Sequence, residues 1–167
     1  VEKYRTFGPG GGGVNPFAVF AADAAAVIDT CLRREVAAFG RIAVSGTSRG
    51  GYLALYLLAH EARVTAAAGF APVTDWRVLS EFSADVQREE VCALALADYA
   101  TRMAGRAVFM SIGANDDRVG TKDCMALRDA LEEAGAEVEF VLTDDAGHTM
   151  GIEGYKSGVD FLLAQFA

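Results

Sequence analysis

A serine within a glycine-rich turn is the first candidate for chemistry in this sequence. Ser48 stands in Gly46-Thr-Ser-Arg-Gly50, which fits the Gly-x-Ser-x-Gly pattern of a nucleophile elbow. An elbow turns so tightly from strand to helix that a Cβ at position 46 or 50 is expected to collide with a neighbouring element. Its serine projects at the start of the helix, where free N–H groups favour developing negative charge. An ordinary strand-to-helix turn that contains a serine is the alternative.

A nucleophilic serine needs a base, because its hydroxyl is a weak nucleophile at neutral pH. His148, in the sequence Asp-Ala-Gly-His, is the natural candidate, and a loop histidine with only local hydrogen bonds is the alternative. The other histidine, His60, falls late in the helix expected after the elbow. We therefore expect His60 to be structural.

The third member would be an acid that orients the His148 ring and stabilises its charged form. Asp116 and Asp117 are adjacent in Gly-Ala-Asn-Asp-Asp-Arg-Val, and Asp116 is favoured because it stands at the first turn after a predicted strand. Asp75 is a less favoured substitute. For Arg118 the sequence leaves three roles open, namely a pairing with Asp117, a place in the pocket lining, or a solvated loop position.

The elements that must position these residues alternate between strands and helices. Short apolar runs predict strands at 41–45, 64–70, 106–112 and 137–142, and helical periodicity predicts helices at 17–39, 52–60, 122–134 and 154–166. Nearly continuous apolar strands indicate a parallel sheet covered on both faces. The prediction is one α/β domain over residues 1–167, a three-layer α/β/α sandwich. The candidate residues Ser48, Asp116 and His148 follow three different predicted strands. They therefore lie at the carboxyl edge of the sheet, where ligands bind in such folds.

Composition excludes several other classes of protein. With 167 residues and 52% hydrophobic residues the chain is neither disordered nor larger than one ordinary domain. A net charge of −8 argues against a nucleic-acid partner, and no apolar run approaches the roughly 20 residues of a membrane span. Cys31, Cys92 and Cys124 suit neither a disulfide framework nor a metal site. No signal peptide is visible, and we expect a cytoplasmic protein without metal or organic cofactor.

These motifs together resemble the α/β-hydrolase superfamily, and within it the bacterial prolyl-oligopeptidase-like and dienelactone-hydrolase-like esterases and peptidases. The matching segments are Arg41-Ile-Ala-Val-Ser-Gly-Thr-Ser-Arg-Gly-Gly-Tyr, Gly113-Ala-Asn-Asp-Asp-Arg-Val and Ala146-Gly-His. The resemblance implies that the first aspartate of Asp-Asp-Arg-Val, Asp116, is the triad acid. It also implies that the backbone N–H of Arg49 donates to the oxyanion.

The resemblance departs from the family pattern at the front of the sequence. The family fold normally has several strands before the elbow strand, and a loop among them supplies the second oxyanion donor. Here residues 4–8 resemble the exit of the fourth of those strands, and the glycine run at 10–13 fits a connecting loop. We therefore expect an N-terminally shortened domain, whose elbow strand forms a sheet edge. A homodimer that completes this edge is the corresponding hypothesis.

The sequence therefore predicts a serine hydrolase of small carboxylic esters, with Ser48 as nucleophile, His148 as base, Asp116 as orienting acid and the Arg49 N–H as oxyanion donor. Residues 72–105 lie where this fold often carries a cap. Within them Trp76, Leu79, Phe82 and Tyr99 are expected to line an apolar acyl pocket, or else to be ordinary core, and Trp76 and Arg118 are the predicted substrate contacts. The alternatives are a serine peptidase of the prolyl-oligopeptidase-like group and a non-catalytic α/β binding module with an incomplete oxyanion hole.

Overall fold

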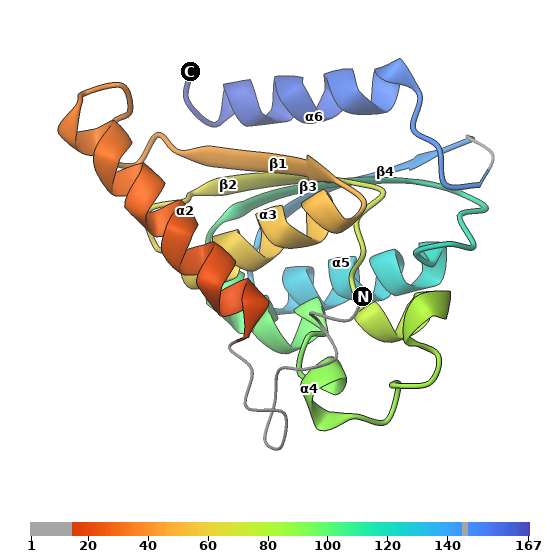
Figure 1. Ribbon diagram of the computed structural model, residues 1–167. Coiled ribbons are helices and arrows are strands. Elements are labelled where there is room, and N and C mark those ends of the chain that lie inside the picture. Colours follow the sequence, from red (N-terminus) through yellow and green to blue (C-terminus); the bar gives the residue numbers. More distant parts are fainter. Residues whose placement is uncertain (1–14, 145–146) are drawn as a thin grey trace.

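Four parallel strands form the centre of the protein. In the computed structural model, which describes residues 15–144 and 147–167, the strands are β1 (Ala43–Thr47), β2 (Ala66–Phe70), β3 (Ala107–Gly113) and β4 (Glu137–Thr143). They lie in the order β1-β2-β3-β4 (Figure 1), and every neighbouring pair is parallel. The carboxyl ends of all four strands therefore lie at one edge of the sheet.

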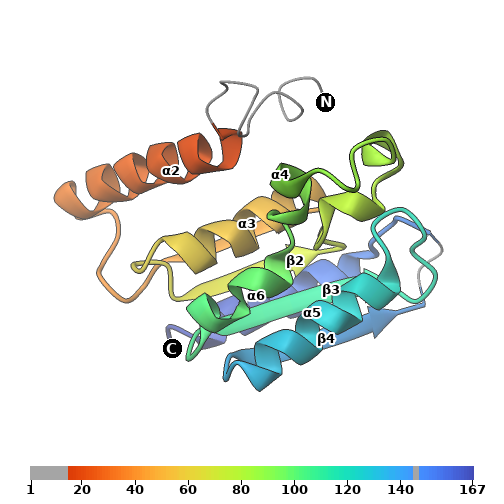
Figure 2. The same ribbon diagram turned by 90° about the horizontal axis from the view of Figure 1, so that it is seen from below.

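Helices cover both faces of this sheet. The α3 helix (Arg49–His60) packs on β1 and β2, and α5 (Thr121–Glu133) packs on β3 and β4. The α6 helix (Ile152–Ala164) covers the opposite face of β2 and β3, and α2 (Pro16–Arg33) packs outside α3 (Figures 1 and 2). This arrangement confirms the predicted α/β/α sandwich with a parallel sheet.

The apolar strands differ in burial according to their place in the sheet. Every residue of the central strands β2 and β3 is buried, as expected for strands covered on both faces. The outer strands β1 and β4 keep partly exposed positions. The larger core cluster lies between the sheet and α3 and α5, and a smaller one lies under α6 around Phe109 and Phe161.

Three of the predicted pocket residues in segment 72–105 lie in the core. The segment contains short helices, which are η1 (Trp76–Val78), η2 (Ser80–Phe82), α4 (Glu89–Cys92) and η3 (Leu96–Met103). Trp76, Leu79 and Phe82 are each at most 2% exposed, and η3 packs against α3 and α5. The expected acyl-pocket lining is therefore wrong for these three side chains, because the segment buries them to complete the core above α3.

The first helix is shorter than its sequence pattern predicts. It ends at Arg33, and Glu35 adopts a left-handed conformation with φ 57°, so the apolar residues up to Phe39 lie in turns. The sequence interpretations of residues 4–8 and 10–13 lie outside the described residues. Within the part of the chain that the structure describes, no helix has both the length and the apolarity needed to cross a bilayer.

Candidate active site

Ser48 occupies a strained turn between β1 and α3. Its φ of 56° and ψ of −117° lie in a region that non-glycine residues rarely adopt. Backbone hydrogen bonds hold this conformation: the Ser48 N–H donates to the Phe70 carbonyl at 2.8 Å, and its own carbonyl accepts from Val73 and Tyr52, each at 3.1 Å. The turn is therefore fixed both by the neighbouring strand and by the helix that it begins.

Two glycines allow the turn to close. A Cβ at Gly46 would lie 2.2 Å from the Gly50 carbonyl oxygen, and a Cβ at Gly51 would lie 2.8 Å from Pro72 Cβ. The expectation of a collision at position 50 is wrong, because a Cβ there would have no heavy atom within 4 Å. The close packing of the backbone predicted for this pentapeptide therefore requires glycine at position 46. Gly51, just after the pentapeptide, is the second position with no room for a Cβ.

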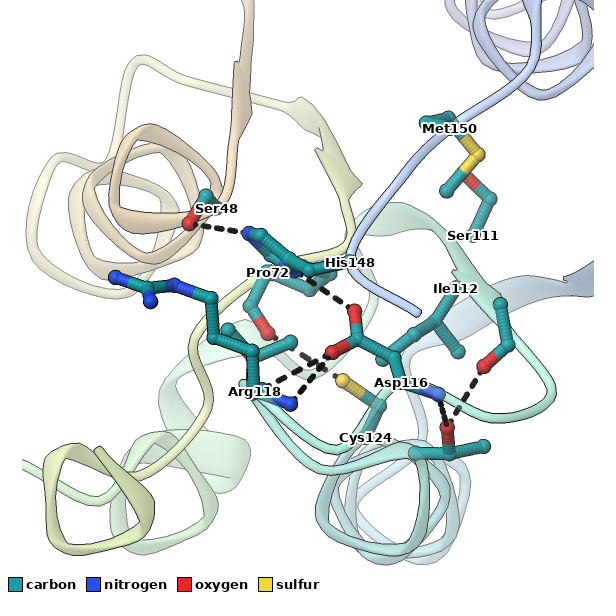
Figure 3. Close-up of polar contacts among 12 residues, drawn as sticks. Ser48, Pro72, Ser111, Ile112, Asp116, Arg118, Cys124, His148 and Met150 are labelled. Atoms are coloured by element: carbon teal, nitrogen blue, oxygen red, sulfur yellow. Dashed lines mark hydrogen bonds and ion pairs between the residues drawn. The ribbon is translucent and has the colours of Figure 1, made fainter. Parts of the chain in front are cut away.

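His148 lies between Ser48 and Asp116 and contacts both (Figure 3). Its Nε2 atom is 2.9 Å from Ser48 Oγ, and its Nδ1 atom is 2.8 Å from Asp116 Oδ2. An ionised carboxylate only accepts hydrogen bonds, so Nδ1 carries the proton and donates to Asp116. This tautomer leaves the Nε2 lone pair directed at the Ser48 hydroxyl, which donates to it.

Asp116 is buried and held at both carboxylate oxygens. Its side chain is 0% exposed, and while Oδ2 accepts from His148, Oδ1 accepts from the backbone N–H groups of Arg118 at 2.9 Å and Val119 at 3.2 Å. The Asp116 N–H donates in turn to the hydroxyl of Thr121 at 3.1 Å. The neighbouring Asp117 is exposed, so the structure brings Asp116 rather than Asp117 to the histidine.

A thiol that the sequence analysis did not connect with the site lies beneath this acid. Cys124 on α5 is fully buried, and its Sγ donates to the Pro72 carbonyl at 3.4 Å. Burial, reinforced by the charge of Asp116, raises the pKa of the Cys124 thiol far above its usual range. The thiol is therefore protonated and unreactive, and it serves as packing under the loop of Asp116.

Two arginines flank the nucleophile and share one carboxylate. The side chain of Arg49 forms an ion pair with Glu81 on η2, and Arg118 Nη2 lies 3.9 Å from the same Glu81 oxygen. Of the roles left open for Arg118, a pairing with an acid is therefore present, but the acid is Glu81. No local signal in the sequence could connect Glu81 with Ser48, because the contact depends on how segment 72–105 folds over α3.

The remaining predicted positions lie in the core or at its edge. Trp76, predicted to contact substrate, packs its buried ring against Phe17, Tyr52 and Phe82, with ring centroids 5.2 to 5.4 Å apart. His60 stacks on the Tyr56 ring, and its Nδ1 atom lies 2.8 Å from the Tyr56 carbonyl oxygen. The contacts of Trp76 and His60 are therefore those of residues that stabilise the fold.

Comparison with known proteins places the chain among hydrolases. The model of a family described as the prolyl oligopeptidase family matches residues 18–167. No curated protein sequence matches the chain significantly.

Several solved structures share the fold. Acetyl xylan esterase 1 from a Thermoanaerobacterium species superposes with a TM-score of 0.72 at 20% identity, over 90% of this chain and 52% of the esterase. Dipeptidyl peptidase 4 from Porphyromonas gingivalis gives 0.73 at 22% identity, over 88% of this chain and 22% of the peptidase. Acylaminoacyl peptidase from Pyrococcus horikoshii superposes with a TM-score of 0.72 at 19% identity, over 86% of this chain and 27% of the peptidase. The chain thus spans about half the length of the esterase and about a quarter of each peptidase.

Proposed function

The chain belongs to the prolyl oligopeptidase family of serine hydrolases, and we propose that it cleaves small carboxylic esters with Ser48 as nucleophile. The observation that carries the proposal is the continuous path from Ser48 Oγ through the His148 ring to Asp116, with links of 2.9 and 2.8 Å. A hydroxyl, an imidazole and a buried carboxylate in this order activate a serine toward a carbonyl carbon.

In the first half of the proposed reaction Ser48 becomes acylated. Its hydroxyl proton passes to His148 Nε2 while Oγ forms a bond to the ester carbonyl carbon. When the tetrahedral intermediate collapses, the bond to the alcohol oxygen breaks, and that oxygen takes the proton from Nε2. Asp116 remains ionised throughout and stabilises the imidazolium through the hydrogen bond at Nδ1.

In the second half a water molecule releases the acyl group. Water gives a proton to His148 Nε2 while its oxygen bonds to the acyl carbon, and the bond to Ser48 Oγ then breaks. Ser48 recovers the proton and the carboxylic acid leaves. The strained turn supports this cycle, because it holds Ser48 at a φ of 56° with its side chain directed toward His148 (Figure 3).

We assign the backbone N–H of Arg49 as a donor to the developing oxyanion. Arg49 is the first residue of α3, and the N–H groups in the first turn of a helix have no acceptor inside the helix. The helix dipole favours negative charge at the same place. Loss of one such donor typically slows acyl transfer about 10²- to 10³-fold.

Peptide cleavage is the second candidate, since two of the similar structures are peptidases. The same residues would then protonate a leaving amine instead of an alcohol. Esters come first because a peptide needs, beyond the groups that activate Ser48, further groups that hold its backbone or its terminal amine.

The proposal is tested by steady-state kinetics on 4-nitrophenyl butyrate and on the 4-nitroanilide of a short acyl peptide. We expect turnover of the ester that depends on Ser48. Faster turnover of the anilide would favour the peptidase. If the ester is cleaved no faster by the wild type than by Ser48→Ala, and the anilide is not cleaved, the non-catalytic binding module is the better description.

A further inference from the structure

Two guanidinium groups meet at one carboxylate directly beside the candidate nucleophile. Arg49 follows Ser48 in the chain, and its Nη2 atom contacts Glu81 Oε1. Arg118 reaches the same oxygen at 3.9 Å from the loop of Asp116. Its backbone is fixed there, because its N–H donates to Asp116 Oδ1 at 2.9 Å. The elbow and the acid loop thus each present one arginine to the same space.

Two guanidinium groups share one carboxylate side chain here. Among the described residues, Arg49 and Arg118 both form an ion pair with Glu81, and neither forms an ion pair with a second carboxylate. The opposite arrangement exists at Arg63, which pairs with both Asp29 and Glu61. The sharing of one carboxylate by two arginines therefore distinguishes this place from an ordinary surface ion pair.

The two arginines also keep hydrogen-bond donors available. Their side chains are 47% and 56% exposed, whereas that of Glu81 is 22% exposed. A guanidinium carries five N–H donors in a planar fork that matches the two oxygens of a carboxylate. One oxygen of Glu81 uses only part of this capacity. Because both arginine side chains are about half exposed, their ion pairs with Glu81 contribute little free energy, and a second carboxylate can exchange for Glu81.

We propose that Arg49 and Arg118 form a carboxylate-binding subsite, and that Glu81 occupies it until the carboxylate of a substrate replaces it. This inference rests on the proposed function and narrows its substrate to esters that carry a free carboxylate on the acyl chain, such as the monoesters of short dicarboxylic acids. Glu81 then determines specificity, because it gathers the two guanidinium groups and competes with the substrate for them.

The test compares two esters that differ only at the far end of the acyl chain, which is a methyl group in 4-nitrophenyl hexanoate and a carboxylate in the 4-nitrophenyl monoester of adipic acid. For the wild type we expect a higher kcat/KM on the adipate monoester. Arg118→Gln and Arg49→Gln, which keeps the backbone N–H, should each lower the ratio of the two kcat/KM values about tenfold, mainly through KM. Arg118→Lys should restore part of it, and Glu81→Gln should raise it. The matched control is Arg128→Gln on α5, which should leave the ratio unchanged.

The outcomes separate this inference from the proposed function. If the hexanoate is hydrolysed through Ser48 but the ratio is the same in the wild type, Arg118→Gln and Glu81→Gln, the subsite is wrong and the esterase stands. If neither ester is hydrolysed, the proposed function fails, and the subsite is judged by NMR titration of Ser48→Ala with monomethyl adipate. Binding that Arg118→Gln weakens supports it, and no binding overturns it.

Discussion

His148 Nε2 lies 2.9 Å from Ser48 Oγ, although the two residues are one hundred positions apart in the sequence. Ser48 follows β1 and His148 follows β4, which are the two outer strands of the described sheet. The chain after β4 therefore returns across the carboxyl edge of the sheet before α6 packs on β2 and β3. Asp116, which follows β3, meets the histidine on this return path.

The two neighbouring aspartates provide a matched test of the acid. Asp116→Asn should reduce kcat by about 10³- to 10⁴-fold, because an amide does not hold the tautomer of His148 that leaves Nε2 free to accept the serine proton. Asp117→Asn removes the same charge one position later, on an exposed side chain, and should change kcat less than twofold. The measurement is steady-state ester hydrolysis with circular dichroism as the check on folding. Equal losses in both variants would contradict the assignment.

The glycines of the elbow provide a second matched pair. Gly46→Ala should disrupt the elbow, lowering both the melting temperature and activity, because its Cβ would lie 2.2 Å from the Gly50 carbonyl oxygen. Gly50→Ala should be tolerated and should even stabilise the helix slightly, since the position is open and helical. Thermal unfolding of both variants decides between them. Greater destabilisation by Gly50→Ala would show that the packing at the elbow differs from this description.

The sequence was sufficient to predict those site residues that directly follow a strand. The Gly-x-Ser-x-Gly turn, the acid three residues after Gly113 and the histidine after β4 each follow an apolar run, and a parallel sheet gathers such positions at one edge. The positions of Trp76 and Glu81 were not predictable in this way. They depend on how the irregular segment 72–105 packs on α3, and neither hydrophobicity nor charge distinguishes a core tryptophan from one that lines a pocket.

Local sequence patterns also led to two predictions that the structure contradicts, the length of the first helix and the tight packing at Gly50. Apolar spacing continues past Arg33 to Phe39, yet α2 ends at Arg33 where the chain turns toward β1. The collision expected for a Cβ at Gly50 was inferred from the Gly-x-Ser-x-Gly motif alone. Which atoms lie near Gly50 depends on the fold, and in the structure no heavy atom lies within 4 Å of such a Cβ.

Stability in acid should depend on the ion pair between Glu61 and Arg63. Arg63 Nε and Nη2 donate to the two Glu61 oxygens at 2.8 and 2.7 Å, and these bonds lower the pKa of Glu61 from its ordinary value of 4.5 to about 2. A lowered pKa stabilises the folded state above pH 4.5, and this contribution disappears as pH falls toward 2. At pH 7, Glu61→Gln should therefore lower the free energy of unfolding by about 1 kcal/mol.

Urea unfolding at several pH values checks this dependence. The difference between the wild type and Glu61→Gln should shrink steadily below pH 4.5. Glu139→Gln, on an exposed position of β4, is the control and should show a much smaller difference at pH 7. A Glu61→Gln difference that stays constant from pH 7 to pH 2 would mean that the ion pair does not contribute to stability.

The homodimer through the edge of β1 stays a prediction. In the described sheet β1 pairs only with β2, and an outer strand offers N–H and C=O groups for pairing with a second copy. Sedimentation velocity of the chain at micromolar concentration should then give the mass of a dimer. A folded species with the mass of one chain at the same concentration would contradict this prediction.

The central claim is that Ser48 is the activated nucleophile, and covalent labelling tests it most directly. A fluorophosphonate reacts with a serine only when a base takes its proton and the oxyanion is stabilised. We predict that intact-mass spectrometry of the wild type shows the addition of one phosphonyl group, that peptide mapping assigns it to Ser48, and that Ser48→Ala is not labelled. A folded wild-type protein that stays unlabelled, or a label that persists in Ser48→Ala, would contradict the account.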